Sequence, residues 1–189
     1  DALTLCFKLA DAPPGTFDLS LNSALPMGKG MGSSAAFAAA ILRAISQLKT
    51  VDPEAHTLAQ WVNEVEAIFH GTPSGVDGAV VSHGGLLRFQ RGEPSILEPL
   101  TLPRALPIVL ADSGDIGETS KMVGAVRQRL ETQPEDTRRI FEEIEALTLE
   151  GLEAMSRGDL MALGPLMVAN HDRLREIGVS TPTLDSMVT

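Results

Sequence analysis

Three glycines at alternate positions, Gly28, Gly30 and Gly32, are followed directly by two hydroxyl side chains, Ser33 and Ser34. Glycine takes positive φ values readily and has no Cβ, so its backbone can approach a ligand closely. The alanine-rich run that follows predicts a helix, whose first turn has unpaired N–H groups and the positive end of the helix dipole. This combination predicts a cradle for an anion, most often a phosphate. A flexible turn before a core helix is the alternative interpretation.

Glu66 is the first candidate partner for such a cradle. It lies in a helix predicted over 53–69, on the border of the apolar face, whereas Glu64 points to solvent. That apolar face consists of Leu58, Val62, Val65 and Phe69. A half-buried carboxylate needs a cation or strong hydrogen-bond donors, because burying it without a partner is costly. A metal ion would meet this need, and so would a salt bridge at the edge of the core.

Asp77 is the candidate general base. It follows the predicted tight turn Thr72–Gly75 and precedes Gly78, so glycines on both sides leave its carboxylate accessible. An accessible carboxylate beside a phosphate cradle suits a base that acts on a hydroxyl. The alternative is an ordinary surface aspartate in a turn.

A second glycine-containing junction covers 112–119 and places Thr119 at the expected N-cap of the next helix. Lys29 and Lys121 are possible phosphate partners, although lysines that face solvent are far commoner. Met31 is interpreted from its residue type as a packing side chain. His70 is interpreted as structural, because it lies in the last turn of its helix. Asn170 and His171 are interpreted as a hydrogen-bonded pair at the edge of a helix.

The elements that must position these residues can be predicted from periodicity and caps. Strands are predicted over 3–9, 17–23, 84–89 and 106–111. Helices are predicted over 33–49, 53–69, 76–81, 119–132, 135–156 and 159–176, with a last one starting after Pro182. Four prolines within 92–107 change the composition there, so we place a domain boundary near residue 103. The two predicted domains are 1–103 and 104–189.

Composition restricts the class of partner. The chain has 189 residues, 43% hydrophobic and 21% charged, as is ordinary for a globular protein. A net charge of −10 argues against a nucleic-acid partner, which requires a basic face. The longest apolar run, 35–42, is too short to cross a membrane. The single cysteine, Cys6, allows no internal disulfide and favours a cytoplasmic location.

Taken together, these segments resemble the GHMP kinase superfamily, and within it the branch that phosphorylates mevalonate. Pro26–Ala36 is similar to the family motif P-x-G-x-G-[LM]-G-S-S-A. His70–Asp77, with Glu66 four residues before the histidine, resembles the next active-site segment. Segments 112–127 and 170–182 resemble later family elements, so the likeness covers nearly the whole chain. The resemblance implies an α+β fold with a first domain like ribosomal protein S5 domain 2 and a ferredoxin-like second domain.

The resemblance also implies roles for single residues. ATP phosphates would lie in the cradle of Gly28, Lys29, Gly30, Met31, Gly32, Ser33 and Ser34. Mg²⁺ would be held with the help of Ser34 and Glu66, and Asp77 would receive or orient the proton of the substrate hydroxyl. Thr119 would lie close to the transferring phosphate. The implied reaction is phosphorylation of the primary hydroxyl of mevalonate in isoprenoid synthesis, with no nucleic-acid or membrane partner and with a homodimer left open.

Two family segments have no counterpart in this chain: an early one with a lysine that contacts substrate, and a late glycine-rich motif. We therefore expect a central piece of a kinase, in which the complete protein carries the activity and this chain alone does not. Two alternatives remain open at this stage. One is another small-molecule kinase of the superfamily, such as one acting on phosphomevalonate. The other is a ligand-binding module that has kept the cradle and lost catalysis.

Overall fold

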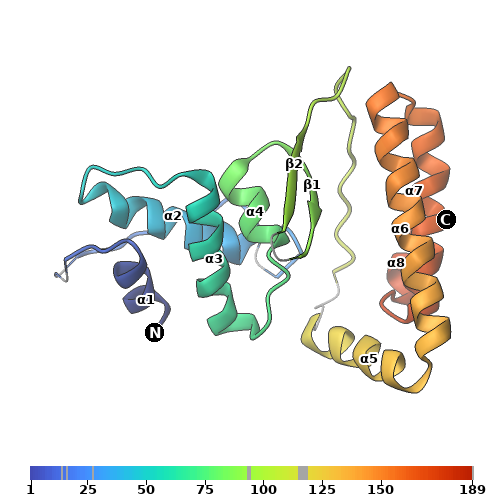
Figure 1. Cartoon of the computed structure of the whole chain (residues 1–189), viewed down its shortest axis with the longest axis horizontal. Helices are drawn as coiled ribbons and strands as arrows, with labels where there is room; N and C mark the ends of the chain where they lie inside the picture. Colours follow the sequence, from blue (N-terminus) through green and yellow to red (C-terminus); the bar gives the residue numbers. More distant parts are fainter. Residues whose placement is uncertain (14, 16, 27, 93–94, 115–118, 189) are drawn as a thin grey trace. The chain divides into compact units, whose positions relative to one another are not determined.

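The computed structural model describes residues 1–13, 15, 17–26, 28–92, 95–114 and 119–188, without the side chains of residues 70, 119 and 120. They form two compact units, Asp1–Leu100 and Thr101–Thr189. Figure 1 labels the helices and strands of each unit. Among these residues, no helix combines the length and the apolar character needed to cross a membrane.

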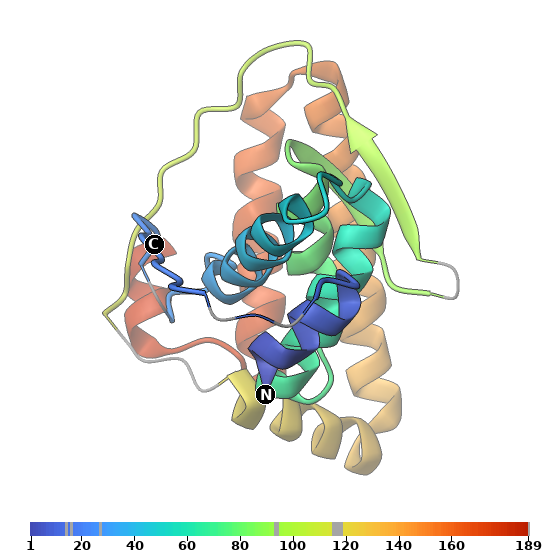
Figure 2. The ribbon, with the colours of Figure 1, turned by 90° about the vertical axis from the view of Figure 1, so that its left-hand side faces the viewer.

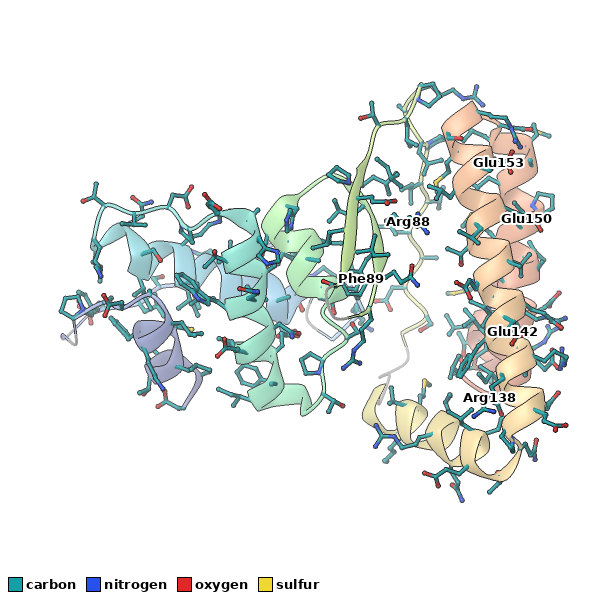
Figure 3. The ribbon with its side chains drawn as sticks, in the orientation of Figure 1. Arg88, Phe89, Arg138, Glu142, Glu150 and Glu153 are labelled. Carbon is teal, nitrogen blue, oxygen red and sulfur yellow. The ribbon has the colours of Figure 1, made fainter. Side chains whose placement is uncertain are left out.

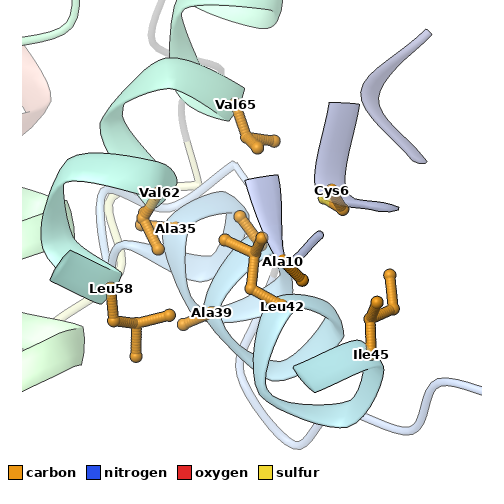
Figure 4. Close-up of a cluster of buried hydrophobic side chains, with 10 residues drawn as sticks. Cys6, Ala10, Ala35, Ala39, Leu42, Ile45, Leu58, Val62 and Val65 are labelled. Atoms are coloured by element: carbon orange, nitrogen blue, oxygen red, sulfur yellow. The ribbon is translucent and has the colours of Figure 1, made fainter. Parts of the chain in front are cut away.

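The first unit is built on four helices that enclose one apolar core. These are α1 (Ala2–Leu9), α2 (Ser33–Gln47), α3 (Ala55–His70) and α4 (Val76–His83). Leu42 of α2 and both Leu58 and Val62 of α3 are fully buried, and Figure 4 shows them gathered where the two helices meet. The turned view in Figure 2 shows α1 lying against α2 and α3.

The prediction of a strand over 3–9 is wrong, because these residues belong to α1. Asp1 caps this helix by accepting a hydrogen bond from the Thr4 N–H at 2.9 Å, and Cys6 is buried in the core. Leu5, Cys6 and Leu9 are spaced for one helical face as well as for a partly alternating strand, so periodicity alone did not separate the two.

Two further predicted strands, 17–23 and 106–111, have no regular secondary structure. A strand requires a neighbouring strand for its backbone hydrogen bonds. In the part of the chain that the structure describes, the one sheet pairs β1 (Leu86–Gln90) antiparallel with β2 (Ile96–Leu100). Figure 3 shows Arg88 on β1, whose guanidinium bonds Glu98 across the ladder at 2.9 Å. β2 was not predicted, because Pro99 disfavours a strand interior.

The second unit is helical over its described residues and consists of α5 (Thr119–Thr132), α6 (Pro134–Arg157), α7 (Leu160–Ile177) and α8 (Pro182–Val188). The predicted positions of these helices are confirmed to within about two residues. Pro134 opens α6, and the Asp159 side chain caps α7 by accepting from the Ala162 N–H at 3.1 Å. Ile140 of α6 is fully buried.

Ion pairs tie these helices together. Asp136 in the first turn of α6 accepts hydrogen bonds from Arg139 at 2.8 Å and from Arg129 of α5 at 2.7 Å. The bonds from Arg139 and then Arg129 hold the pKa of Asp136 below its usual value. Arg139 also reaches Glu176 of α7 at 2.6 Å. These side chains are partly exposed, so their main effect is to set the geometry among the helices.

The predicted pair of His171 with Asn170 is wrong, because His171 pairs instead with Asp185 on α8. Its Nε2 lies 2.9 Å from the Asp185 carboxylate, which also accepts a hydrogen bond from Ser180 at 2.7 Å. This cluster joins the end of α7 to α8. The hydrogen bonds from Ser180 and then His171 lower the pKa of Asp185.

Candidate functional site

The glycine loop before α2 has the backbone conformation for which its glycines were singled out. Gly28, Gly30 and Gly32 have φ values of 71°, 69° and 64°, in the left-handed region that strains other residues. Gly32 is the N-cap residue of α2, and it caps without a side chain. The loop therefore presents bare backbone at the positive end of a 15-residue helix.

Ser34 and Glu66 meet at this same end of α2. Ser34 is the second residue of α2, and its Oγ donates a hydrogen bond to Glu66 Oε2 at 3.2 Å. Glu66 projects from α3 and is only 4% exposed, which is more buried than its border position predicted. Glu64 is exposed, as predicted, whereas Phe69 is 61% exposed and does not continue the apolar face of α3. Phe69 lies in the last turn of α3, beyond the residues buried against α2.

Asp77 faces the glycine loop from the first turn of α4. A Cβ built on Gly32 would lie 3.4 Å from Asp77 Oδ1, so the carboxylate lies next to Gly32, about one methyl group away from its backbone. The side chain is exposed and hence accessible to a ligand. The turn before it is held by Ser74, whose Oγ accepts from the Val76 N–H at 3.3 Å.

Gly78 determines how close α4 comes to α3. A Cβ at this position would lie 3.1 Å from the Ala59 carbonyl oxygen and 3.3 Å from Val62 Cγ1. Both distances are tighter than ordinary Cβ contacts, and a backbone carbonyl yields less easily than a flexible side chain, so a larger residue would push the two helices slightly apart. The close packing places the start of α4, and with it Asp77, beside the loop.

The donor set of this site suits a hard divalent cation. Mg²⁺ prefers oxygen ligands and is usually bound by one or two carboxylates together with substrate phosphates and water. Ser34 and Glu66 supply a hydroxyl and a carboxylate within 3.2 Å of each other, beside a loop shaped for an anion. Among the described residues there is no group of three or more His, Cys, Asp or Glu side chains that could hold a metal without a ligand's help. The residues present therefore fit a cation that arrives with a phosphate.

The other predicted residues lie either in the loop itself or in the second unit. Lys29 and Ser33 are half-buried within the loop region, and Met31 is 41% exposed, so its predicted packing role is wrong for this loop. Thr119 begins α5 in the second unit, and its side chain lies outside the described part, as do residues 115–118 of the junction that leads to it. Lys121 is exposed on α5.

Asn63 was missed by the sequence reasoning. It lies on α3, one turn before Glu66, and its Oδ1 would be 3.9 Å from a Cβ on Gly75, the N-cap residue of α4. The sequence contained a signal for it: Asn63 is three residues before Glu66, and residues three apart on a helix are neighbours on its surface. It was overlooked because asparagine gives no strong motif of its own.

A comparison with protein families matches residues 2–85 to the N-terminal domain of GHMP kinases. Two curated relatives are mevalonate kinases. The one from Pyrococcus horikoshii is 36% identical over 192 residues, covering 99% of this chain and 56% of the relative. The one from Mus musculus is 33% identical over 209 residues, covering 98% of this chain and 51% of the relative. The chain thus spans about half the length of the curated relatives it matches.

Solved structures give the same likeness. A crystal structure of L. major mevalonate kinase in complex with R-mevalonate matches with a TM-score of 0.75 and 27% identity, covering 98% of this chain and 58% of that one. The Methanococcus jannaschii mevalonate kinase matches in fold with a TM-score of 0.72 at 21% identity. The predicted α+β fold is confirmed by these neighbours, and within the described residues its strand content is the β1–β2 pair.

Proposed function

Because the chain belongs to the GHMP kinase family, we propose that it supplies the ATP phosphate site and the catalytic base of an enzyme that phosphorylates the primary hydroxyl of mevalonate. One observation carries the proposal: the Gly32 backbone, the Ser34–Glu66 pair and the Asp77 carboxylate all lie at the start of α2. Phosphoryl transfer depends on positioning and on neutralising charge rather than on covalent chemistry of the protein. These residues are suited to both tasks.

The loop from Gly28 to Ser34 binds the ATP phosphates in this proposal. Its left-handed glycines expose backbone N–H groups, and the N-terminus of α2 adds its dipole. Lys29 adds a positive charge within the same loop. These positive groups offset the overall acidity of the chain locally and so favour an anion at this loop.

Ser34 and Glu66 hold Mg²⁺ through their side-chain oxygens. When bound, the cation would neutralise charge on the phosphate oxygens. Burial of Glu66 makes its carboxylate a strong ligand, because few water molecules compete for it. Ser34 orients that carboxylate through its hydrogen bond.

Asp77 accepts the proton of the substrate hydroxyl, or orients that hydroxyl toward the phosphate. Its exposure, which lets a substrate reach it, and its position beside Gly32 support this role. By its resemblance to the family, Thr119 is proposed to act near the transferring phosphate. We assign residues 1–103 to the N-terminal, ATP-binding domain and 104–189 to the C-terminal domain.

A coupled assay on the full-length protein tests this function. ADP release should depend on mevalonate, on ATP and on Mg²⁺, and phosphomevalonate should not replace mevalonate. No turnover of mevalonate would refute the substrate assignment. Asp77→Ala should abolish turnover and leave ATP binding nearly unchanged, since Asp77 is proposed to act on the substrate hydroxyl and not to hold the phosphates. Retained turnover would mean that the base is another residue.

A further inference from the structure

Asn63 has a buried acceptor that the folded first unit does not use. Its Oδ1 is shielded from solvent and has no hydrogen-bond partner among the residues that the structure describes. Burying an acceptor without a donor is unfavourable, and such atoms in native proteins call for a water, an ion or a functional explanation. An apolar side chain of the same shape would serve packing at least as well. The amide is therefore suited to a donor that arrives from outside the protein.

The surroundings of Asn63 indicate which donor this is. A Cβ built on Gly75 would lie 3.9 Å from Asn63 Oδ1 and 3.4 Å from the ring of Phe89, a side chain on β1 labelled in Figure 3. Asn63 Oδ1 therefore lies near Gly75, which is two residues before Asp77. One turn further along α3 is Glu66, which bonds Ser34. Asn63 thus belongs to the same helix face as the carboxylate assigned to the metal and adjoins the helix that carries the base.

We propose that Asn63 is a positioning residue whose Oδ1 accepts a hydrogen bond from a water molecule coordinated to Mg²⁺. This rests on the proposed function. Mg²⁺ gives up its water reluctantly and keeps several molecules when bound to protein. Such waters are strong donors and need acceptors around them, and residues that supply these acceptors typically change metal affinity 10- to 100-fold when removed. Asn63 supplies an acceptor without adding charge.

The test compares binding of two nucleotide forms to the full-length protein by calorimetry: an unhydrolysable ATP analogue alone, and the same analogue loaded with Mn²⁺. Asn63→Leu should weaken binding of the Mn²⁺-loaded form about tenfold or more and leave the metal-free form unchanged. The unfolding temperature should stay the same or rise, because an unused buried acceptor is removed. Asn63→Asp retains an acceptor and should bind the loaded form at least as tightly as the wild type.

Gln60→Leu is the matched control, because it makes the same change from amide to leucine on an exposed position of α3. It should alter neither affinity. Equal losses for both nucleotide forms in Asn63→Leu, or no loss, would overturn the proposal. A rise only in the KM for the alcohol substrate would also overturn it, since the donor would then be the substrate hydroxyl. If mevalonate is not turned over but the Mn²⁺ effect is present, the substrate assignment fails and this inference stands.

Discussion

Gly32 is where the glycine loop meets the proposed base, so replacing it with alanine should impair two properties at once. Its φ of 64° is left-handed, a conformation that costs an L-residue about 1–2 kcal/mol. If ATP binding requires this conformation, that cost corresponds to about a 5- to 30-fold loss of affinity. In addition, the new methyl group would lie 3.4 Å from Asp77 Oδ1, so it would contact the carboxylate directly.

Gly30→Ala separates these two effects. Gly30 has nearly the same φ, 69°, but a Cβ there has nothing within 4 Å. Both variants should therefore lose ATP affinity to a similar extent, whereas only Gly32→Ala should also lower kcat at saturating ATP. We expect that fall to be at least about tenfold, because the methyl group would occupy the space beside the carboxylate where the substrate hydroxyl must be positioned for reaction.

The assays are calorimetric titration with an unhydrolysable ATP analogue and a coupled measurement of ADP release with mevalonate, both on the full-length protein. Equal kcat values for the two alanine variants would refute the reasoning, because they would show that Asp77 does not work beside Gly32. Unchanged ATP affinity in both would show that the left-handed loop is not the phosphate site.

Three further predictions concern stability, measured by thermal or urea unfolding. Gly78→Ala should lower the free energy of unfolding by about 1–3 kcal/mol, since its Cβ would lie 3.1 Å from the Ala59 carbonyl oxygen and push it aside. Gly124→Ala, which has open space around it in α5, should be neutral or stabilising. Equal effects of the two changes would contradict the packing argument. Leu42→Ala, at a fully buried site, should cost about 2–5 kcal/mol, and a loss below about 1 kcal/mol would mean that the core is loosely packed. The lowered pKa of Asp136 means that its ion pairs stabilise the fold above its unfolded pKa, about 4, and lose this effect as the pH falls through the lower folded value. Asp136→Asn should therefore lower the urea midpoint at pH 6, and the difference from the wild type should shrink as the pH falls below about 4. A difference that stays constant across that range would exclude this titration.

Local signals predicted much of this chain. The helices α5, α6 and α7 were found because their starts and ends have strong chemical markers, such as Pro134 at the start of α6 and Gly178 after α7. The glycine loop was found for the same reason, since only glycine tolerates its backbone. The strands at 17–23 and 106–111 were predicted wrongly, because a strand depends on a partner that no local pattern supplies.

Residue types and spacing by themselves determined which side chains could do chemistry: a glycine loop before a helix, a carboxylate on the inner edge of α3 and an aspartate in a glycine-flanked turn. The tertiary structure decided that these three features meet. Because α2, α3 and α4 pack closely, Ser34 donates a hydrogen bond to Glu66, and the Asp77 carboxylate lies next to Gly32. It also decided that Glu66 is almost fully buried and revealed the unused acceptor of Asn63. Burial and distance depend on packing between segments far apart in the chain, and no local pattern records them.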